Sequence, residues 1–365
     1  MTEGSENETN VDWVSHMHGI MDIAIKDSAS DIHFKANEPP ALRLDSDIKR
    51  LIEYNPLSGE QVNALINSVM PANHRETFEK EFEVDFSYQY KDTRFRVNVG
   101  LENEGMFATL RIIPREIRPI IQIGFPNECW KKIINLESGL IVVAGKTGSG
   151  KTTTLASLIN EINKTSPKKI ITLEDPIEYC YTGNKSVIIQ RELYTHTKSF
   201  LRGVKWAMRQ DPDVLLVGEI RDSDTASEVI TAVDTGHLVF CTVHSKDSKG
   251  AIEKIVDLFP EGKKKDARDS IASNVEYVLA QQLIPYSRGS DRKLAMEVLH
   301  ANYGVRSLIR DNKLHQLVNQ FTSRSDEDMI SMDKRLADMF SAGLITREEA
   351  IRNAIDEKMI MDYLP

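Results

Sequence analysis

Residues 140–159 read LIVVAGKTGSGKTTTLASLI, an aliphatic run followed by three glycines within six positions, a lysine and three threonines. Gly145 to Thr152 match the pattern G-x-x-x-x-G-K-[ST], and the match lies between a strand pattern and a helix pattern. Glycines let successive backbone N–H groups converge on an anion, and the start of a helix adds its positive dipole end. The stretch therefore predicts a phosphate-binding loop.

The predicted ligands of this loop are ATP and Mg²⁺. The Lys151 side chain would reach the β- and γ-phosphates, and the Thr152 hydroxyl would bind the magnesium ion. The other nucleotide-binding candidates come from the same loop and the first helical turn: Gly145, Lys146, Thr147, Gly148, Ser149, Gly150 and Thr153. The alternative is a glycine-rich turn with a solvated lysine, which the flanking strand and helix patterns disfavour.

Length, charge and cysteine content limit the remaining possibilities. A chain of 365 residues exceeds what one core usually organises, so we expect two domains. The net charge of -9 disfavours a general polyanion-binding surface, so we expect no nucleic-acid partner. Three scattered cysteines form neither a disulfide framework nor a zinc site, which suits a reducing compartment. No apolar run approaches the roughly 20 residues that span a bilayer, so we expect a soluble, cytoplasmic protein without membrane insertion.

The first part of the chain predicts a compact α+β domain over residues 11–113, after a disordered tail over residues 1–10. Apolar residues at helical spacing predict an amphipathic helix over 11–27 that buries Val14, Met17, Met21 and Ile25. SGEQVNALINSVM (58–70) predicts a second helix. Five segments predict strands: DIHFK (31–35), ALRLD (41–45), FSYQYK (86–91), RFRVNVG (94–100) and FATLRII (107–113).

The second part predicts strands that alternate with helices, which is typical of a mostly parallel sheet covered by helices. Prolines punctuate a linker over 114–134, a core of alternating strands and helices is expected over 135–290, and a mainly helical region over 291–365. SIASNVEYVLAQQL (270–283) is interpreted as helical, and KLAMEVL (293–299) as one possible strand. The predicted core strands are GLIVVAG (139–145), KIITLED (169–175), SVIIQR (186–191), VLLVGEI (214–220) and HLVFCTV (237–243).

Acidic residues follow two of these strands. LEDPIEY (173–179) clusters Glu174, Asp175 and Glu178, and Glu219 follows Gly218 where the common Walker B pattern has aspartate. Ligand chemistry gathers at the carboxyl ends of parallel strands, where a carboxylate can hold magnesium or orient water. Either cluster alone could equally be a helix N-cap or a surface turn. Together, behind a phosphate-binding loop, they favour catalysis.

Two histidines, His237 and His244, bracket the last of the predicted core strands. A histidine at a strand end is more often a satisfied structural group than a catalytic one. Since one histidine lies at each end of the strand, the two need not share a site.

Four motifs in this order resemble the type II/type IV secretion ATPase superfamily: GKTGSGKTT (145–153), LEDPIEY (173–179), DPDVLLVGEIRD (211–222) and TGHLVFCTVHS (235–245). They are similar to its Walker A, Asp box, atypical Walker B and His box. The nearest likeness is to the twitching-motility retraction ATPases (PilT/PilU-like). The short N-terminal domain, the absence of a tetracysteine insert and GVRSLIRDNKLHQL (304–317) carry that likeness. The acidic run Asp326–Asp328 departs from the family pattern and leaves the role of segment 323–332 open.

The resemblance implies an α/β protein with an N-terminal α+β (PAS-like) domain and a C-terminal RecA-like P-loop NTPase domain with a helical tail. It implies that Glu178 is the general base and that Glu219, with Thr152, supports the magnesium ion. His237 and His244 would sense the γ-phosphate or bridge the nucleotide to neighbouring elements. Arg96 and Arg111 would reach from the N-terminal domain toward the nucleotide of an adjacent subunit, whereas the alternative for both is an exposed strand residue.

The function implied is that of an ATP-hydrolysing homohexameric motor that powers type IV pilus retraction. Its partners would be an inner-membrane pilus platform protein and a paralogous motor ATPase, at the inner face of the cytoplasmic membrane. One alternative is a secretion, conjugation or pilus-assembly ATPase of the same superfamily. Another is a nucleotide-binding accessory subunit of a different motor ring. A DNA helicase is disfavoured by the acidic balance.

Overall fold

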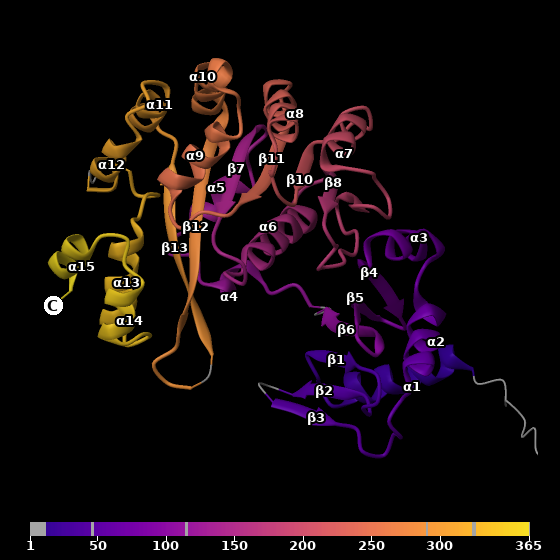
Figure 1. Cartoon of the computed structure of the whole chain (residues 1–365). Helices are drawn as coiled ribbons and strands as arrows, with labels where there is room; N and C mark the ends of the chain where they lie inside the picture. The colour runs from indigo at the N-terminus through magenta and orange to yellow at the C-terminus, as the bar shows by residue number, and fades with distance from the viewer. Residues whose placement is uncertain (1–11, 45–46, 114–115, 290, 323–325, 365) are drawn as a thin grey trace, which may run out of the picture. The chain divides into compact units, whose positions relative to one another are not determined.

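The computed structural model describes residues 12–44, 47–113, 116–289, 291–322 and 326–364. The chain forms two compact units, Met1–Glu116 and Ile117–Pro365 (Figure 1). The tail predicted over residues 1–10 lies outside the described residues. No helix in the described ranges is both long enough and apolar enough to cross a membrane.

The first unit is an antiparallel sheet with three helices. Its strand order is β3-β2-β1-β6-β5-β4, and every neighbouring pair is antiparallel. The elements are α1 (Trp13–Lys26), β1 (Asp31–Phe34), β2 (Ala41–Leu44), β3 (Asp47–Arg50), α2 (Gly59–Val69), α3 (Ala72–Glu81), β4 (Glu83–Tyr90), β5 (Thr93–Glu102) and β6 (Gly105–Ile113).

Apolar faces of the helices and of the sheet form the core of this unit. The predicted first helix is present, but its buried face is Met17, Ile20, Met21 and Ala24. Val14, predicted to be buried, is 37% exposed, because it lies in the first turn and outside that stripe.

The second unit is built on a seven-stranded sheet in the order β13-β12-β7-β11-β10-β8-β9. All neighbours are parallel except β12 and β13. Two clusters of buried residues line the two faces of the sheet, one with α4, α5 and α6 and the other with α7 to α11 (Figure 1). The strands are β7 (Gly139–Ala144), β8 (Lys169–Glu174), β9 (Val187–Glu192), β10 (Val214–Val217), β11 (Leu238–Val243), β12 (Val275–Pro285) and β13 (Arg292–His300).

The helices of this unit connect the strands and then continue to the C-terminus. In chain order they are α4 (Ile120–Ile123), α5 (Cys129–Ile133), α6 (Lys151–Thr165), α7 (Phe200–Ala207), α8 (Ser223–Asp234), α9 (Ser248–Asp257), η1 (Glu261–Lys263), α10 (Lys264–Asn274), α11 (Tyr303–Arg310), η2 (Leu314–Gln316), α12 (Val318–Thr322), α13 (Met332–Ser341), α14 (Arg347–Arg352) and α15 (Glu357–Tyr363).

The helix predicted over 270–283 is wrong. The helix α10 ends at Asn274, and β12 begins at Val275 and runs between β7 and β13 in the sheet. The strand expected at 293–299 is present as β13, which pairs with β12 along its length although the prediction placed it in the mainly helical region. Two short helices, α4 and α5, lie within the predicted linker, and Ile120, Ile123, Cys129 and Ile133 of these helices are buried in the core of the second unit.

Candidate active site

The phosphate-binding loop connects β7 to α6, as its sequence predicts. Gly148 and Gly150 have φ angles of +76° and +88°, a left-handed conformation that L side chains rarely adopt. A β-carbon at Gly145 would lie only 2.2 Å from the Ser149 Oγ atom. The glycines are therefore required by the backbone path and by close approach within the loop.

Lys151 begins α6, and its ammonium group lies over the loop. The Nζ atom donates hydrogen bonds to the carbonyl oxygens of Gly145 (2.9 Å) and Lys146 (3.2 Å). The buried Ser149 Oγ atom has no hydrogen-bond partner among the described residues. A concave loop with a poised ammonium and an unsatisfied hydroxyl fits a bound polyphosphate.

The phosphate-binding loop is supported by β12, a strand whose sequence predicted a helix. Gln281 of β12 is fully buried, and its Nε2 atom donates a hydrogen bond of 2.7 Å to the Ser149 carbonyl. The residue before it, Ala280, pairs with Ala144 at the end of β7. Because 270–283 is interpreted as a helix from its sequence, this contact could not be anticipated.

The charges of two predicted acidic residues act on the lysine of the phosphate-binding loop. Burial lowers the pKa of Lys151, and the negative charges of Glu219 and Glu178 oppose that shift. The structure therefore brings both predicted carboxylates into the electrostatic environment of the loop lysine.

Glu219 follows β10 and lies in a network of charged side chains. Its carboxylate contacts His244 Nε2 at 3.1 Å and accepts a hydrogen bond of 2.7 Å from Arg221 Nε. Arg221 also reaches Asp175 at 3.2 Å, so it connects the two acidic segments. Burial, and then the charge of Lys151, lowers the pKa of His244 while Glu219 opposes the shift. Arg221 was not among the residues predicted from the sequence, although it stands two residues after Glu219.

Gly218 has a steric reason to be glycine. A β-carbon there would lie 3.1 Å from the Leu173 carbonyl oxygen at the end of β8. The Gly218 N–H also donates to that oxygen at 2.8 Å, and the Gly218 carbonyl accepts a hydrogen bond from the Thr242 hydroxyl. The aspartate of a common Walker B pattern would have to displace the backbone of β8.

Glu178 lies half-buried in the segment between β8 and β9, and side chains of β9 hold the backbone on both sides of it. Gln190 Nε2 donates to the Tyr179 carbonyl at 2.7 Å, and Gln190 Oε1 accepts from the Tyr181 N–H at 3.0 Å. The Tyr179 hydroxyl lies 3.0 Å from the Thr153 hydroxyl in the first turn of α6. The segment that carries Glu178 is thus attached both to β9 and to the phosphate-binding helix.

A second side chain of β9, Glu192, completes this support. It is 3% exposed, and its Oε2 atom accepts a hydrogen bond of 3.1 Å from the Ile177 N–H. Gln190 and Glu192 were not among the residues predicted from the sequence. Three polar residues, Gln190, Arg191 and Glu192, end this strand consecutively, so the sequence carries no pattern that marks two of them as supports of Glu178.

Glu174 is a buried acid beneath the same segment. Its Oε1 atom accepts hydrogen bonds from the Thr172 hydroxyl (2.6 Å) and from Gln190 Nε2 (3.1 Å). Burial raises the pKa of Glu174 to about 7, and the two hydrogen bonds oppose that shift. This carboxyl group is therefore a structural partner of Gln190, in contrast to the partly exposed Glu178.

His237 lies away from the phosphate-binding loop within this chain, and its expected role in sensing the γ-phosphate or bridging the nucleotide to neighbouring elements stays a prediction. It precedes β11, and its carbonyl accepts from the Gly139 N–H at the start of β7. Its Nδ1 atom lies 2.9 Å from the Ala232 carbonyl. His244 follows the other end of β11, and six residues of strand separate the two by roughly 20 Å. The structure therefore brings His244, and not His237, to the phosphate-binding edge.

Arg96 and Arg111 lie in the first unit and are direct cross-strand partners on β5 and β6. Arg96 forms an ion pair with Asp85 at 3.1 Å, and Arg111 with Asp31 at 2.9 Å. The Arg111 side chain is 64% exposed. The two guanidinium groups thus share one face of the sheet, and their action on a nucleotide stays a prediction.

The residues of the second unit fit both predicted ligands. Glycine-shaped backbone, the Lys151 ammonium and the start of a helix of 15 residues suit a nucleoside triphosphate. The Thr152 hydroxyl and the Glu219 carboxylate are hard oxygen donors of the kind that Mg²⁺ prefers. The parallel sheet, the loop and the acidic residues after its strands define this unit as a P-loop nucleotide-binding domain.

Comparison with known proteins places the chain in a family. Residues 7–338 match the family described as Type II/IV secretion system protein, and the chain belongs to it. A twitching motility protein of Neisseria gonorrhoeae is 40% identical over 86% of this chain and 84% of its own length. The type IV pilus retraction ATPase PilT of Pseudomonas aeruginosa is 37% identical over 92% of this chain and 97% of its own.

Solved structures agree with this assignment. The crystal structure of the pilus retraction motor PilT with bound ADP superposes with a TM-score of 0.88 at 39% identity, covering 94% of this chain and 98% of that one. The ATPase DotB of Legionella pneumophila gives a TM-score of 0.76 at 26% identity, covering 96% and 98%. The predicted family and fold class are confirmed.

Proposed function

We propose that this protein is an ATP-hydrolysing motor that powers type IV pilus retraction, the movement behind twitching motility. One structural observation carries the proposal: the phosphate-binding loop and Glu219 follow parallel strands at the same edge of the sheet, and Tyr179, next to Glu178, contacts Thr153 of the phosphate-binding helix. Phosphate binding and acidic groups suited to hydrolysis therefore occupy the same edge of the sheet. The names of the relatives at 40% and 37% identity support pilus retraction as the work performed.

Each residue of the site has a role in this proposal. The loop N–H groups and Lys151 bind the phosphates, and Thr152 and Glu219 hold the magnesium ion. Glu178 accepts a proton from the attacking water, and its half-buried position leaves it partly accessible. When bound, Mg²⁺ neutralises charge that develops on the phosphoryl oxygens. His244, in contact with Glu219, responds to the presence of the γ-phosphate.

The assembly in this proposal is a homohexamer in which Arg96 and Arg111 reach the nucleotide from an N-terminal unit. A guanidinium supplied to a phosphoryl group in this way is worth roughly 10³ to 10⁵ in rate. Loss of the γ-phosphate removes contacts to His244 and to the arginines, and the closed state opens. The motion would act on a platform protein of the inner membrane, with a paralogous motor as a further partner. The motor would work in the cytoplasm at the inner face of that membrane.

The variant Glu178→Gln tests the catalytic assignment. We expect ATP binding to be retained and turnover to fall by at least about 100-fold, because the variant lacks a general base. Glu357→Gln, a substitution of an exposed glutamate on α15, is the matched control and should behave like the parent. Turnover at the parent rate in Glu178→Gln would show that another group activates the water.

A deletion strain tests the work that the motor performs. Excess, immobile surface pili are expected for a retraction motor. Cells without pili would instead indicate an assembly motor, and normal pili would indicate a secretion or conjugation motor. If the purified protein binds ATP but does not turn it over, the accessory-subunit alternative would replace the motor.

A further inference from the structure

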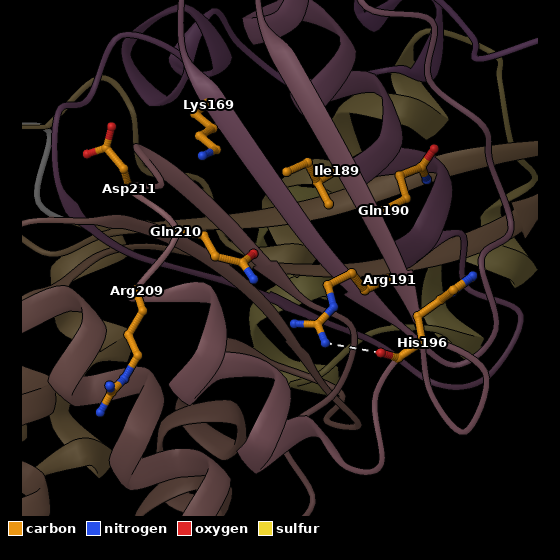
Figure 2. A pocket seen from close by; sticks show the side chains of 8 residues that line it. All are labelled: Lys169, Ile189, Gln190, Arg191, His196, Arg209, Gln210 and Asp211. Atoms are coloured by element: carbon orange, nitrogen blue, oxygen red, sulfur yellow. Dashed lines mark hydrogen bonds between the residues drawn. The ribbon is translucent and has the colours of Figure 1, made fainter.

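A groove opens beside β9, lined by residues of this strand, of α7 and of the segment after α7. The strand β9 is at the edge of the seven-stranded sheet, and α7 packs on the neighbouring strands β8 and β10. A cavity of about 730 Å³ lies over β9, with Ile189 and Arg191 on the strand and Lys169 and Arg209 at its sides (Figure 2). A second cavity of about 310 Å³ shares Arg191 with the first. The two adjoining cavities are here together called the β9 groove.

The β9 groove is positively charged in a chain whose net charge is -9. Lys169, Arg191 and Arg209 line its larger part together with one carboxylate, Asp211, and Lys198 and Arg202 line the smaller part. Within the part of the chain that the structure describes, no carboxylate forms an ion pair with any of these five cations. Local charge of this kind attracts an acidic ligand.

The Arg191 guanidinium has one buried nitrogen without a hydrogen-bond acceptor among the described residues. Arg191 Nη2 donates to the His196 carbonyl at 3.0 Å, whereas Nη1 is buried and has no partner among the described residues (Figure 2). A buried guanidinium nitrogen without an acceptor is costly, and a carboxylate in the groove would supply one.

The shape of the β9 groove favours an extended ligand over a compact one. Figure 2 shows the charged ends of Lys169, Arg191 and Arg209 lying apart from one another and not meeting at one point. Apolar surface lies between and beside them, because Ile189 is 36% exposed and Trp206 is 51% exposed. Separate cations with apolar surface between them suit a peptide that alternates acidic and apolar side chains better than a single phosphate group.

We propose that the β9 groove binds an extended acidic segment of a partner protein. The site is coupled to the catalytic machinery through β9. Ile189, Gln190 and Arg191 line the groove, and the Gln190 amide and the Glu192 carboxylate hold the backbone around Glu178. A ligand that displaces β9 therefore acts on the position of Glu178. This coupling rests on the proposed role of Glu178 as the base, whereas the binding site does not.

The test is a binding measurement on the full-length protein. The probe is a fluorescein-labelled peptide of about twelve residues that alternates glutamate and leucine, with a lysine and leucine peptide as its counterpart. The parent should bind the acidic probe, and Arg191→Glu with Arg209→Glu should weaken that binding at least about tenfold. Arg352→Glu with Lys358→Glu makes the same charge change on exposed residues of the C-terminal helices and should bind like the parent. Arg209→Glu alone, at an exposed position, serves if the double variant fails to fold.

Three outcomes would overturn the site. The first is equal binding by the parent and the groove variant. In the second, inorganic tripolyphosphate binds and the peptide does not, which would make the groove a site for small polyanions. In the third, the parent does not bind the probe and the groove variant changes the sedimentation of the assembly, which would mean that a second copy of the chain fills the groove. ATP turnover in the presence of the probe tests the coupling separately. We expect a change of at least about twofold, and an unchanged rate with the probe bound would overturn the link through β9 alone.

Discussion

Replacing Gln190 by leucine should slow ATP turnover without weakening ATP binding. Gln190 makes three hydrogen bonds, to the Tyr179 carbonyl, the Tyr181 N–H and the Glu174 carboxyl. Leucine fills similar space but offers no polar atom, so both backbone groups beside Glu178 lose their partner. None of these hydrogen bonds involves the phosphate-binding loop, so the affinity of the loop for nucleotide should be preserved.

The size of the effect follows from the bonds that are lost. A hydrogen bond contributes about 0.5–1.5 kcal/mol net, so three of them restrain the segment by roughly 2–4 kcal/mol. If half of that restraint is needed to keep Glu178 in its working position, the loss is about 1–2 kcal/mol. Since about 1.4 kcal/mol corresponds to a factor of ten in rate, kcat should fall roughly fivefold to thirtyfold.

Phosphate release at saturating ATP measures kcat, and a fluorescent ATP analogue measures affinity. Gln122→Leu is the matched control, because Gln122 is exposed in the second unit. It should leave both quantities unchanged. The reasoning would be refuted if Gln190→Leu kept the parent kcat in a folded protein. It would also fail if affinity and kcat fell together, because the loss would then include the phosphate-binding loop.

Further predictions concern the backbone, the histidines and the buried acid. Gly218→Ala should destabilise the protein by about 1–2 kcal/mol in urea unfolding, because the added methyl group meets the Leu173 carbonyl at 3.1 Å; an unchanged midpoint would contradict this. His244→Ala should lower kcat at least about tenfold, whereas His237→Ala should cost about 1 kcal/mol of stability and leave kcat within about twofold, and the reverse pattern would exchange their roles. Glu174 has a pKa raised to about 7 in the folded state. The contribution of its protonated form to the free energy of unfolding is therefore complete below about pH 4.5 and is lost as the pH rises through 7. Glu174→Gln should therefore gain roughly 3 kcal/mol over the parent at about pH 8 and little at about pH 4.5, and a gain that is equal at both pH values in urea unfolding would rule out this titration.

The phosphate-binding loop could be predicted from the sequence because its requirements are local. The positive φ angles of Gly148 and Gly150 and the start of α6 are all encoded within a few residues. The proximity of Glu219 and His244 needed one further assumption, that the strands run parallel. Parallel strands place their carboxyl ends at one edge, so residues that follow β10 and β11 meet there. The same assumption places His237 at the opposite edge.

The strand β12 could not be predicted for a physical reason. It is buried on both faces between β7 and β13, so its residues show no alternation of apolar and polar side chains. An apolar run without alternation does not distinguish a buried strand from a buried helix, and the preceding α10 extends the helical pattern up to Asn274. Pairing with β7, which lies more than 100 residues earlier in the chain, makes this segment a strand. The support that Gln281 gives to the phosphate-binding loop depends on that pairing.

The register of β9 connects the catalytic segment with the β9 groove. Val187 pairs with Lys169 in β8, and this register directs Gln190 and Glu192 to one face and Arg191 to the other. Because side chains alternate with a period of two, a slip of one residue would exchange the faces. Such a slip would bury the Arg191 guanidinium under Glu178 and expose both side chains that hold the catalytic segment. The buried carboxyl group of Glu174, which accepts a hydrogen bond from Gln190, opposes the slip. An edge strand is the position where register is least constrained by neighbours, so these polar contacts help to fix both Glu178 and the groove in place.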